Sequence, residues 1–153
     1  MKNTIKLILL SLLLTKMINA QNVNKKSTVV IEKVRAKENE SVWIIINKVK
    51  YEKKAEYDQF MKDVFLKTLR SSSNKTTQVS AKQTRYLVPD KMNSDSTWSY
   101  VFIFDPVNPS GDYSIPALLK EKYTDAEVEN HMRSYDSFMA KPTQIVKVKQ
   151  SMY

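Results

Sequence analysis

The sequence predicts an α+β domain in which two helices pack on one face of a four-stranded antiparallel sheet. Three observations lead to this prediction. Segments with the two-residue alternation of strands and the 3.6-residue period of helices follow one another as strand, helix, strand, strand, helix, strand. The strongest strand, Thr97–Asp105, is apolar on both faces, which is typical of a strand inside a covered sheet. The 153 residues include no cysteine, so packing must hold the domain together.

The first twenty residues have the pattern of a secretory signal peptide. A basic start at Lys2 and Lys6 is followed by the apolar run Ile5–Leu14 and a polar close before Ala20. The apolar run is too short to span a bilayer. We therefore expect residues 1–20 to be a signal peptide cleaved near Ala20. The mature protein would be periplasmic or secreted, without stable membrane insertion.

Residues 21–41 are predicted to form an N-terminal arm and an edge strand before the main domain at 42–153. Gln21–Ser27 is polar throughout. Thr28–Ala36 alternates like a strand but is only half apolar, which is typical of the edge of a sheet. A polar loop then leads into the first strong strand.

The first strong strand and the first helix of the domain follow directly. Val42–Lys50 opens with five consecutive apolar residues, so it belongs inside the sheet. The period then changes to 3.6, and residues 53–71 predict an amphipathic helix. The polar run Ser71–Thr77 is interpreted as a loop.

Two further strands are predicted to form an antiparallel hairpin. The first spans Lys82–Val88 and ends at Pro89. The second is Thr97–Asp105, reached through a long polar loop. Its aromatic side chains alternate with aliphatic ones, so the two kinds are expected on opposite faces of the sheet.

The second helical region is predicted in two parts. Ser114 can cap a short helix that runs to about Lys122. Thr124 and Glu127 then match a capping box that opens a longer helix. The buried stripe of this helix is predicted to be Val128, Met132, Tyr135 and Met139.

The chain is predicted to close with a fourth strand of the domain. Pro142 ends the helix, and Thr143–Gln150 alternates with Val146 and Val148 inward. This order is the ferredoxin-like β-α-β-β-α-β plan, with the extra N-terminal strand added. Both helices of that plan cover the same face of the sheet, so the other apolar face needs a cover. We expect the same face of a second copy to supply it through a two-fold homodimer.

From Val42 to Tyr153 the chain resembles the dimeric α/β-barrel superfamily, including its antibiotic-biosynthesis-monooxygenase-like and stress-responsive members. The likeness lies in the entry strand and helix at 42–64, the strand TWSYVFIFD and the broken second helix at 114–139. The resemblance implies that two copies of the chain pair their sheets to form a dimeric α/β barrel. The superfamily includes haem-degrading enzymes, cofactor-free oxygenases, dismutases and proteins without known activity, so the resemblance does not choose a chemistry. The chain has no counterpart of the histidine that ligates haem in some members.

Composition excludes several classes of site. Gly111 is the only glycine and His131 the only histidine, so glycine-rich phosphate loops, zinc fingers and iron–sulfur clusters are excluded. We expect no cofactor and no metal. The formal net charge is +9, of which three lysines lie in the first twenty residues. Export makes nucleic acid an unexpected partner, and a solvated lysine-rich surface is the plain interpretation of the charge.

Four tyrosines and the single histidine are the candidate ligand-binding residues. The resemblance implies that small apolar molecules bind between the helices and the sheet, where Tyr57, Tyr86, Tyr100 and Tyr135 would orient them. His131 lies at the edge of the second helix's buried stripe, and histidine is a common ligand and general base. The alternative is that the tyrosines are core aromatics and that His131 is structural.

Three functions stay open from the sequence. The first is a non-catalytic binding or interaction protein that uses the helix–sheet space or the dimer surface. The second, implied by the resemblance, is a cofactor-free oxygenase. The third is a basic surface that binds acidic polymers or lipid headgroups. Catalytic residues are not identified by any motif.

Overall fold

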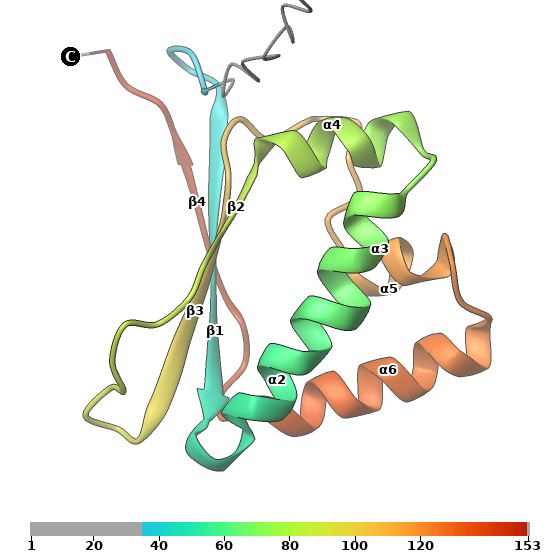
Figure 1. Ribbon diagram of the computed structural model, residues 1–153. Coiled ribbons are helices and arrows are strands. Elements are labelled where there is room, and N and C mark those ends of the chain that lie inside the picture. The colour runs from blue at the N-terminus through green and yellow to red at the C-terminus, as the bar shows by residue number, and fades with distance from the viewer. Residues whose placement is uncertain (1–34, 153) are drawn as a thin grey trace, which may run out of the picture. The chain divides into compact units, whose positions relative to one another are not determined.

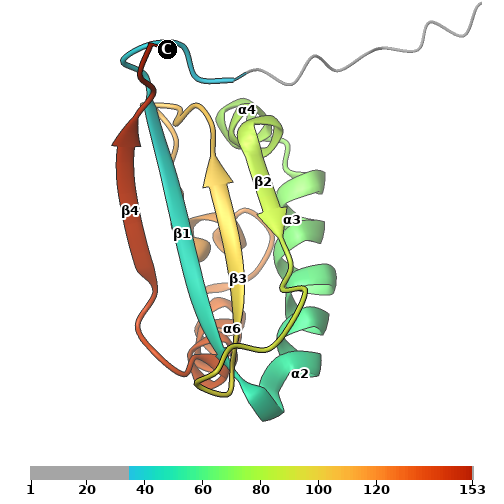
Figure 2. The same ribbon diagram turned by 90° about the vertical axis from the view of Figure 1, so that its left-hand side faces the viewer.

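The computed structural model describes residues 35–152, and these residues contain a four-stranded antiparallel sheet. The strands lie in the order β2-β3-β1-β4, with every neighbouring pair antiparallel (Figure 2). This order confirms the predicted ferredoxin-like α+β plan. The strands are β1 (Ser41–Lys50), β2 (Thr84–Leu87), β3 (Thr97–Phe104) and β4 (Gln144–Lys149).

The predicted signal peptide and most of the N-terminal strand predicted at 28–36 lie outside the described residues. The last two residues of that prediction, Arg35 and Ala36, are described and are not in a strand. The Ala36 N–H donates to Asp105 Oδ1 at 2.8 Å, which ties this end of the described chain to the end of β3.

The first helical region is continuous from Tyr51 to Ser71, close to the helix predicted at 53–71. It contains a 3₁₀ turn, α2 (Lys54–Phe60), a π-helical turn (Met61–Phe65) and α3 (Leu66–Ser71). The predicted amphipathic pattern is confirmed, because Tyr57, Phe60, Met61, Phe65 and Thr68 are buried on one side of this region.

The second helical region, α5 and α6, also follows the prediction. Ser114 Oγ accepts from the Ala117 N–H and caps α5 (Ile115–Lys120). The Thr124–Glu127 capping box opens α6 (Asp125–Phe138). Val128 and Tyr135 are buried on α6 as predicted, and Phe138 is buried with them. Figure 1 shows α2, α3, α5 and α6 on the same side of the sheet.

One helix contradicts the sequence prediction. The segment read as a loop at Ser71–Thr77 contains the start of α4 (Lys75–Gln83), and the next strand begins at Thr84 instead of Lys82. Asn74 Oδ1 accepts the N–H groups of Thr76 and Thr77, which is an N-cap within a polar run. Hydrophobic periodicity missed α4 because its buried residue is the polar Ser80.

The two faces of the sheet have different surroundings. The register pairs Ile45 with Ile145 and Ile44 with Val146. Ile45 packs against the helix-side core, so Ile44 and Val146 point away from the helices. The inward placement of Val146 and Val148 is therefore wrong for this chain, and Val148 is 44% exposed. We call the surface away from the helices the open face; its apolar members are Val42, Ile44, Ile46, Leu87, Val101, Ile103, Val146 and Val148.

Candidate functional site: a cavity between helices and sheet

A cavity of about 230 Å³ lies between the sheet and the second helical region, α5 and α6. β1, β3, β4, α5, α6 and the π-helical turn all contribute to its wall. Most of the lining is apolar, and no carboxylate, amine, guanidinium or imidazole belongs to it. An uncharged ligand suits such a lining, because burying an unpaired charge is costly. The apolar wall includes Ile45, Phe65, Phe102, Phe104, Met132 and Ile145.

Asn47 is the central polar group of the cavity wall. It lies on the helix side of β1 and is 1% exposed. Its Nδ2 donates to Tyr57 OH at 3.1 Å, and its Oδ1 accepts from Thr143 Oγ1 at 2.8 Å. These two bonds fix the orientation of the amide. Asn47 and Thr143 also lie within hydrogen-bonding reach of the Tyr135 hydroxyl, where they partly offset the rise in its pKa that burial causes.

The four candidate tyrosines do come together in one cluster. The Tyr57 ring lies 4.4 Å from that of Tyr100 and 6.2 Å from that of Tyr135, between centroids. Tyr86 stacks on Tyr100 at 6.0 Å with the rings 8° apart. Burial raises the pKa of all four hydroxyls above the ordinary value near 10. They therefore stay protonated near neutral pH.

One end of the tyrosine cluster reaches a carboxylate at the protein surface. Tyr100 OH donates to Asp58 Oδ1 at 2.5 Å, and this hydrogen bond adds to burial in raising the pKa of Tyr100. Lys54 Nζ lies 2.6 Å from the other oxygen of Asp58. Tyr86 OH is buried and has no partner among the described residues. Of the two cluster tyrosines on strands, Tyr100 therefore hydrogen-bonds to α2 through Asp58, and Tyr86 does not.

Tyr135 is the one candidate residue that lines the cavity. Tyr57 and Tyr100 are 0% exposed and form the core beside it. Tyr57 reaches the cavity only through its hydrogen bond to Asn47. The interpretation of these side chains as core aromatics therefore describes Tyr57 and Tyr100 better than direct ligand contact does.

His131 lies apart from the tyrosine cluster. Its ring packs 4.7 Å from Tyr123 and 6.1 Å from Phe60, between centroids. It is half-buried on α6 and does not line the cavity. A ligand-binding role for His131 stays a prediction, without support from its position.

The sequence analysis missed Asn47 and Thr143 as site residues. One signal was available for Asn47, since an amide on the buried face of an apolar strand must find partners. No local signal identifies Thr143. Its contact with Asn47 joins residues 96 positions apart, and the strand pairing of β4 with β1 creates it.

Neither a metal site nor a membrane-spanning helix is found in the part of the chain that the structure describes. Within 35–152, histidine, aspartate and glutamate side chains nowhere gather in a group of three that could hold a metal ion. No helix in that range is long and apolar enough to cross a membrane.

Comparison with known proteins finds matches among solved structures. No protein-family model and no curated protein matches the chain. Among solved structures, a "putative antibiotic biosynthesis monooxygenase" from Caulobacter crescentus is 13% identical, with a TM-score of 0.42 over 75% of this chain and 92% of that chain. A protein of the same description from Nitrosomonas europaea is 14% identical, with a TM-score of 0.40 over 76% and 95%. Rv0793 from Mycobacterium tuberculosis is 10% identical, with a TM-score of 0.37 over 74% and 96%.

Proposed function

We propose that the protein binds a small, uncharged, mainly apolar molecule in the helix–sheet cavity. The observation that carries the proposal is the wall itself, where an amide held in one orientation by two hydrogen bonds interrupts an apolar surface. Ligand pockets commonly combine an apolar wall with a few fixed polar groups. Asn47, Thr143 and Tyr135 would orient the ligand, and the aromatic wall would supply most of the binding free energy.

Binding is the role that the lining supports best. Acid–base chemistry needs a group that exchanges protons near the working pH. Tyr135 is held protonated because burial raises its pKa, and the other polar lining groups are an amide and a hydroxyl. A cofactor-free oxygenase remains the alternative that the resemblance implies.

Binding can be tested with the neutral fluorescent probe N-phenyl-1-naphthylamine. Ile145 lines the cavity and is 51% exposed, so Ile145→Trp should narrow the entrance with little effect on the core. We expect it to weaken probe binding about tenfold or more, as measured by fluorescence titration. Lys149→Trp is the matched control, because Lys149 lies on the same face of β4 but outside the cavity lining. Equal binding by the wild type and Ile145→Trp would contradict the proposal, as would a wild type that does not bind the probe.

The proposal includes a homodimer that covers the open face. Eight aliphatic side chains gather on this face, and no described helix covers them (Figure 2). Large exposed apolar patches mark interaction surfaces. A two-fold pairing brings the same patch of a second copy against it.

Ile44 is the residue to change, because it pairs with Ile103 on one side and Val146 on the other at the centre of the open face. Ile44→Asp should convert a dimer to a monomer in analytical ultracentrifugation, since it buries an unpaired carboxylate in the interface. Lys48→Asp places the same group on the same face of β1, near its end, and should leave the dimer intact. A wild type that sediments as a monomer at all concentrations would remove the dimer from the proposal.

Export to the periplasm or the medium is the remaining part of the proposal. It rests on the signal-peptide pattern of residues 1–20, which lie outside the described range. Mass spectrometry of the protein from its own cells should find a mature N-terminus at or near Gln21.

A further inference from the structure

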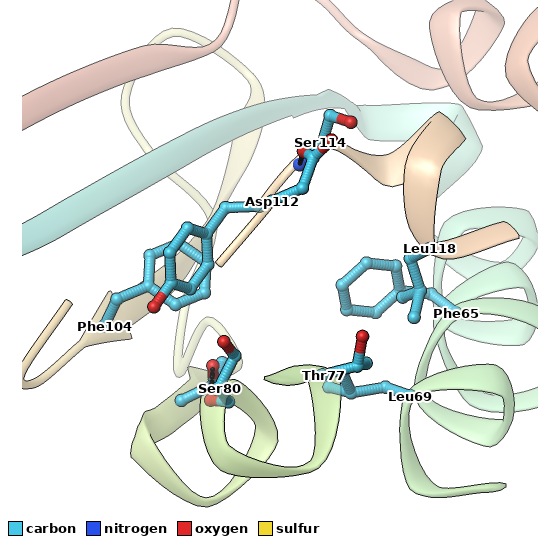
Figure 3. Close-up of a pocket in the computed structure, with 10 residues that line it drawn as sticks. Phe65, Leu69, Thr77, Ser80, Phe104, Asp112, Ser114 and Leu118 are labelled. Atoms are coloured by element: carbon cyan, nitrogen blue, oxygen red, sulfur yellow. Dashed lines mark hydrogen bonds between the residues drawn. The ribbon is translucent and has the colours of Figure 1, made fainter. Parts of the chain in front are cut away.

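A second, smaller hollow of about 30 Å³ lies beside the helix–sheet cavity, under α4. Phe65, Phe104 and Tyr113 line both spaces, so their rings form the boundary between them. In Figure 3, α4 contributes Ser80 and Thr77 to one side of the small hollow, and Phe65 and Leu118 lie across from Phe104. The two spaces therefore adjoin along one aromatic wall.

Ser80 is the polar group in this hollow that lacks a partner. It is 6% exposed, and its Oγ is buried without a hydrogen bond among the described residues. The other four hydroxyls of the lining are engaged. Thr77 Oγ1 donates to Glu121 at 2.5 Å, and Thr84 Oγ1 donates to the Ser80 carbonyl at 2.7 Å. Ser114 Oγ caps α5, and Tyr113 OH accepts from the Asn108 N–H at 2.6 Å. A buried hydroxyl without a hydrogen-bond partner costs free energy. The free Ser80 Oγ therefore suggests that a polar group of a ligand binds in the hollow.

The only glycine of the chain lies against Ser80 and Tyr113, two residues that line the hollow. A Cβ on Gly111 would lie 2.9 Å from Ser80 Oγ and 3.0 Å from the Tyr113 ring. Contacts this short force a neighbour to move. Any other residue at 111 would therefore fill the space in front of the free hydroxyl.

The charge near the hollow selects the kind of group that fits. Asp112 belongs to the lining, and its Oδ1 accepts from the Ser114 N–H at 2.8 Å. That hydrogen bond holds the pKa of Asp112 below its usual range, so the carboxylate is charged at neutral pH. A carboxylate or phosphate would be repelled here. A space of about 30 Å³ holds a group the size of one water molecule, such as a hydroxyl.

We propose that the ligand of the helix–sheet cavity is an elongated neutral molecule with a terminal hydroxyl, and that this hydroxyl passes between the three shared rings to bond Ser80 Oγ. This inference rests on the proposed function and names the class of ligand. The apolar body fills the larger cavity, and the hydroxyl satisfies the one free side-chain oxygen of the smaller hollow.

Two probes with the same number of heavy atoms test the inference in the full mature protein. 1-Decanol carries the terminal hydroxyl, and 1-methoxynonane replaces it with an ether that cannot donate a hydrogen bond. We expect the wild type to bind 1-decanol about tenfold more tightly than the ether in isothermal titration calorimetry. Ser80→Ala should reduce this preference to near unity and leave ether binding unchanged. The variant should fold, because the lost hydroxyl has no partner and alanine favours helix.

Gly111→Ala provides a second, independent variant, since its methyl group occupies the space in front of Ser80 Oγ. It should also remove the preference for the alcohol. If Ser80→Ala retains the full preference, the hydroxyl is bound elsewhere, the small hollow holds only water, and the inference is overturned while cavity binding stands. If the wild type binds both probes equally, the inference is overturned in the same way. If it binds neither probe, both the inference and the proposed function fail.

Discussion

The two faces of the sheet carry different kinds of apolar side chain. The helix side is aromatic and includes hydroxyls and an amide, as in Tyr57, Tyr100 and Asn47, all almost fully buried. The open face is aliphatic and mainly β-branched, without a single ring on its eight apolar positions. Irregular helix–sheet space suits large rings and buried hydrogen bonds, whereas valine and isoleucine form the even surface on which a second sheet packs. The difference indicates a cavity on one side and an interface on the other.

The sharpest test of this comparison uses two neighbours on β3. Phe102 faces the helices, with its ring 4.8 Å from Tyr86 and 5.5 Å from Phe65, whereas Ile103 is half-buried on the open face. Phe102→Ala should lower the free energy of unfolding by about 3–5 kcal/mol because it leaves a cavity in the core. Ile103→Ala should lower the free energy of unfolding by about 1–2 kcal/mol in dilute protein, where the monomer prevails. The loss should be larger at protein concentrations where the dimer forms. Urea unfolding at two protein concentrations measures both. If Ile103→Ala lowers the free energy of unfolding equally at both protein concentrations, the open face is not a dimer interface.

A smaller effect is expected at the buried amide of the helix side. Asn47→Ala leaves Tyr57 OH and Thr143 Oγ1 without their partner, and we expect a loss of about 1–3 kcal/mol in the free energy of unfolding. The neighbouring Ile46→Ala on the open face is the control, because it removes apolar contact but no hydrogen bond. Thermal unfolding followed by circular dichroism compares the two. If Asn47→Ala is as stable as the wild type, the amide is not held as these contacts indicate.

The smallest effect concerns alkaline pH, to which only the helix side should respond. Burial raises the pKa of Tyr57, Tyr86, Tyr100 and Tyr135 in the folded protein, so above pH 10 the unfolded chain binds fewer protons than the folded one. Stability is then complete below about pH 10 and falls as the pH rises. For the fully buried Tyr57 alone the loss is about 1.4 kcal/mol per pH unit.

Tyr57→Phe should reduce this slope by about that amount in urea titrations between pH 10 and 11.5. Tyr51→Phe is the control, because Tyr51 is 58% exposed. A slope unchanged in Tyr57→Phe would mean that the Tyr57 hydroxyl ionises in the folded protein as readily as in the unfolded chain.

Local patterns predicted most of the fold. The alternation of Thr97–Asp105, the period of residues 53–71 and the Thr124–Glu127 capping box are each contained in a short stretch, and each element formed as predicted. Helix α4 was missed because its signal is a single cap at Asn74 within a polar run. The face of Val146 could not be predicted by alternation alone, since alternation separates two faces without saying which of them meets the helices.

The sequence by itself determined the order of the elements, their main boundaries and the existence of two apolar faces, because these follow from side-chain periodicity and capping within a few residues. Only the tertiary structure decided which residues share a site. Asn47 meets Thr143 through the pairing of β1 with β4, and Ser80 faces Gly111 through the packing of α4 beside the loop before α5. These contacts join segments distant in the chain, so their physical cause is the packing of the sheet and helices against one another and no local pattern contains it.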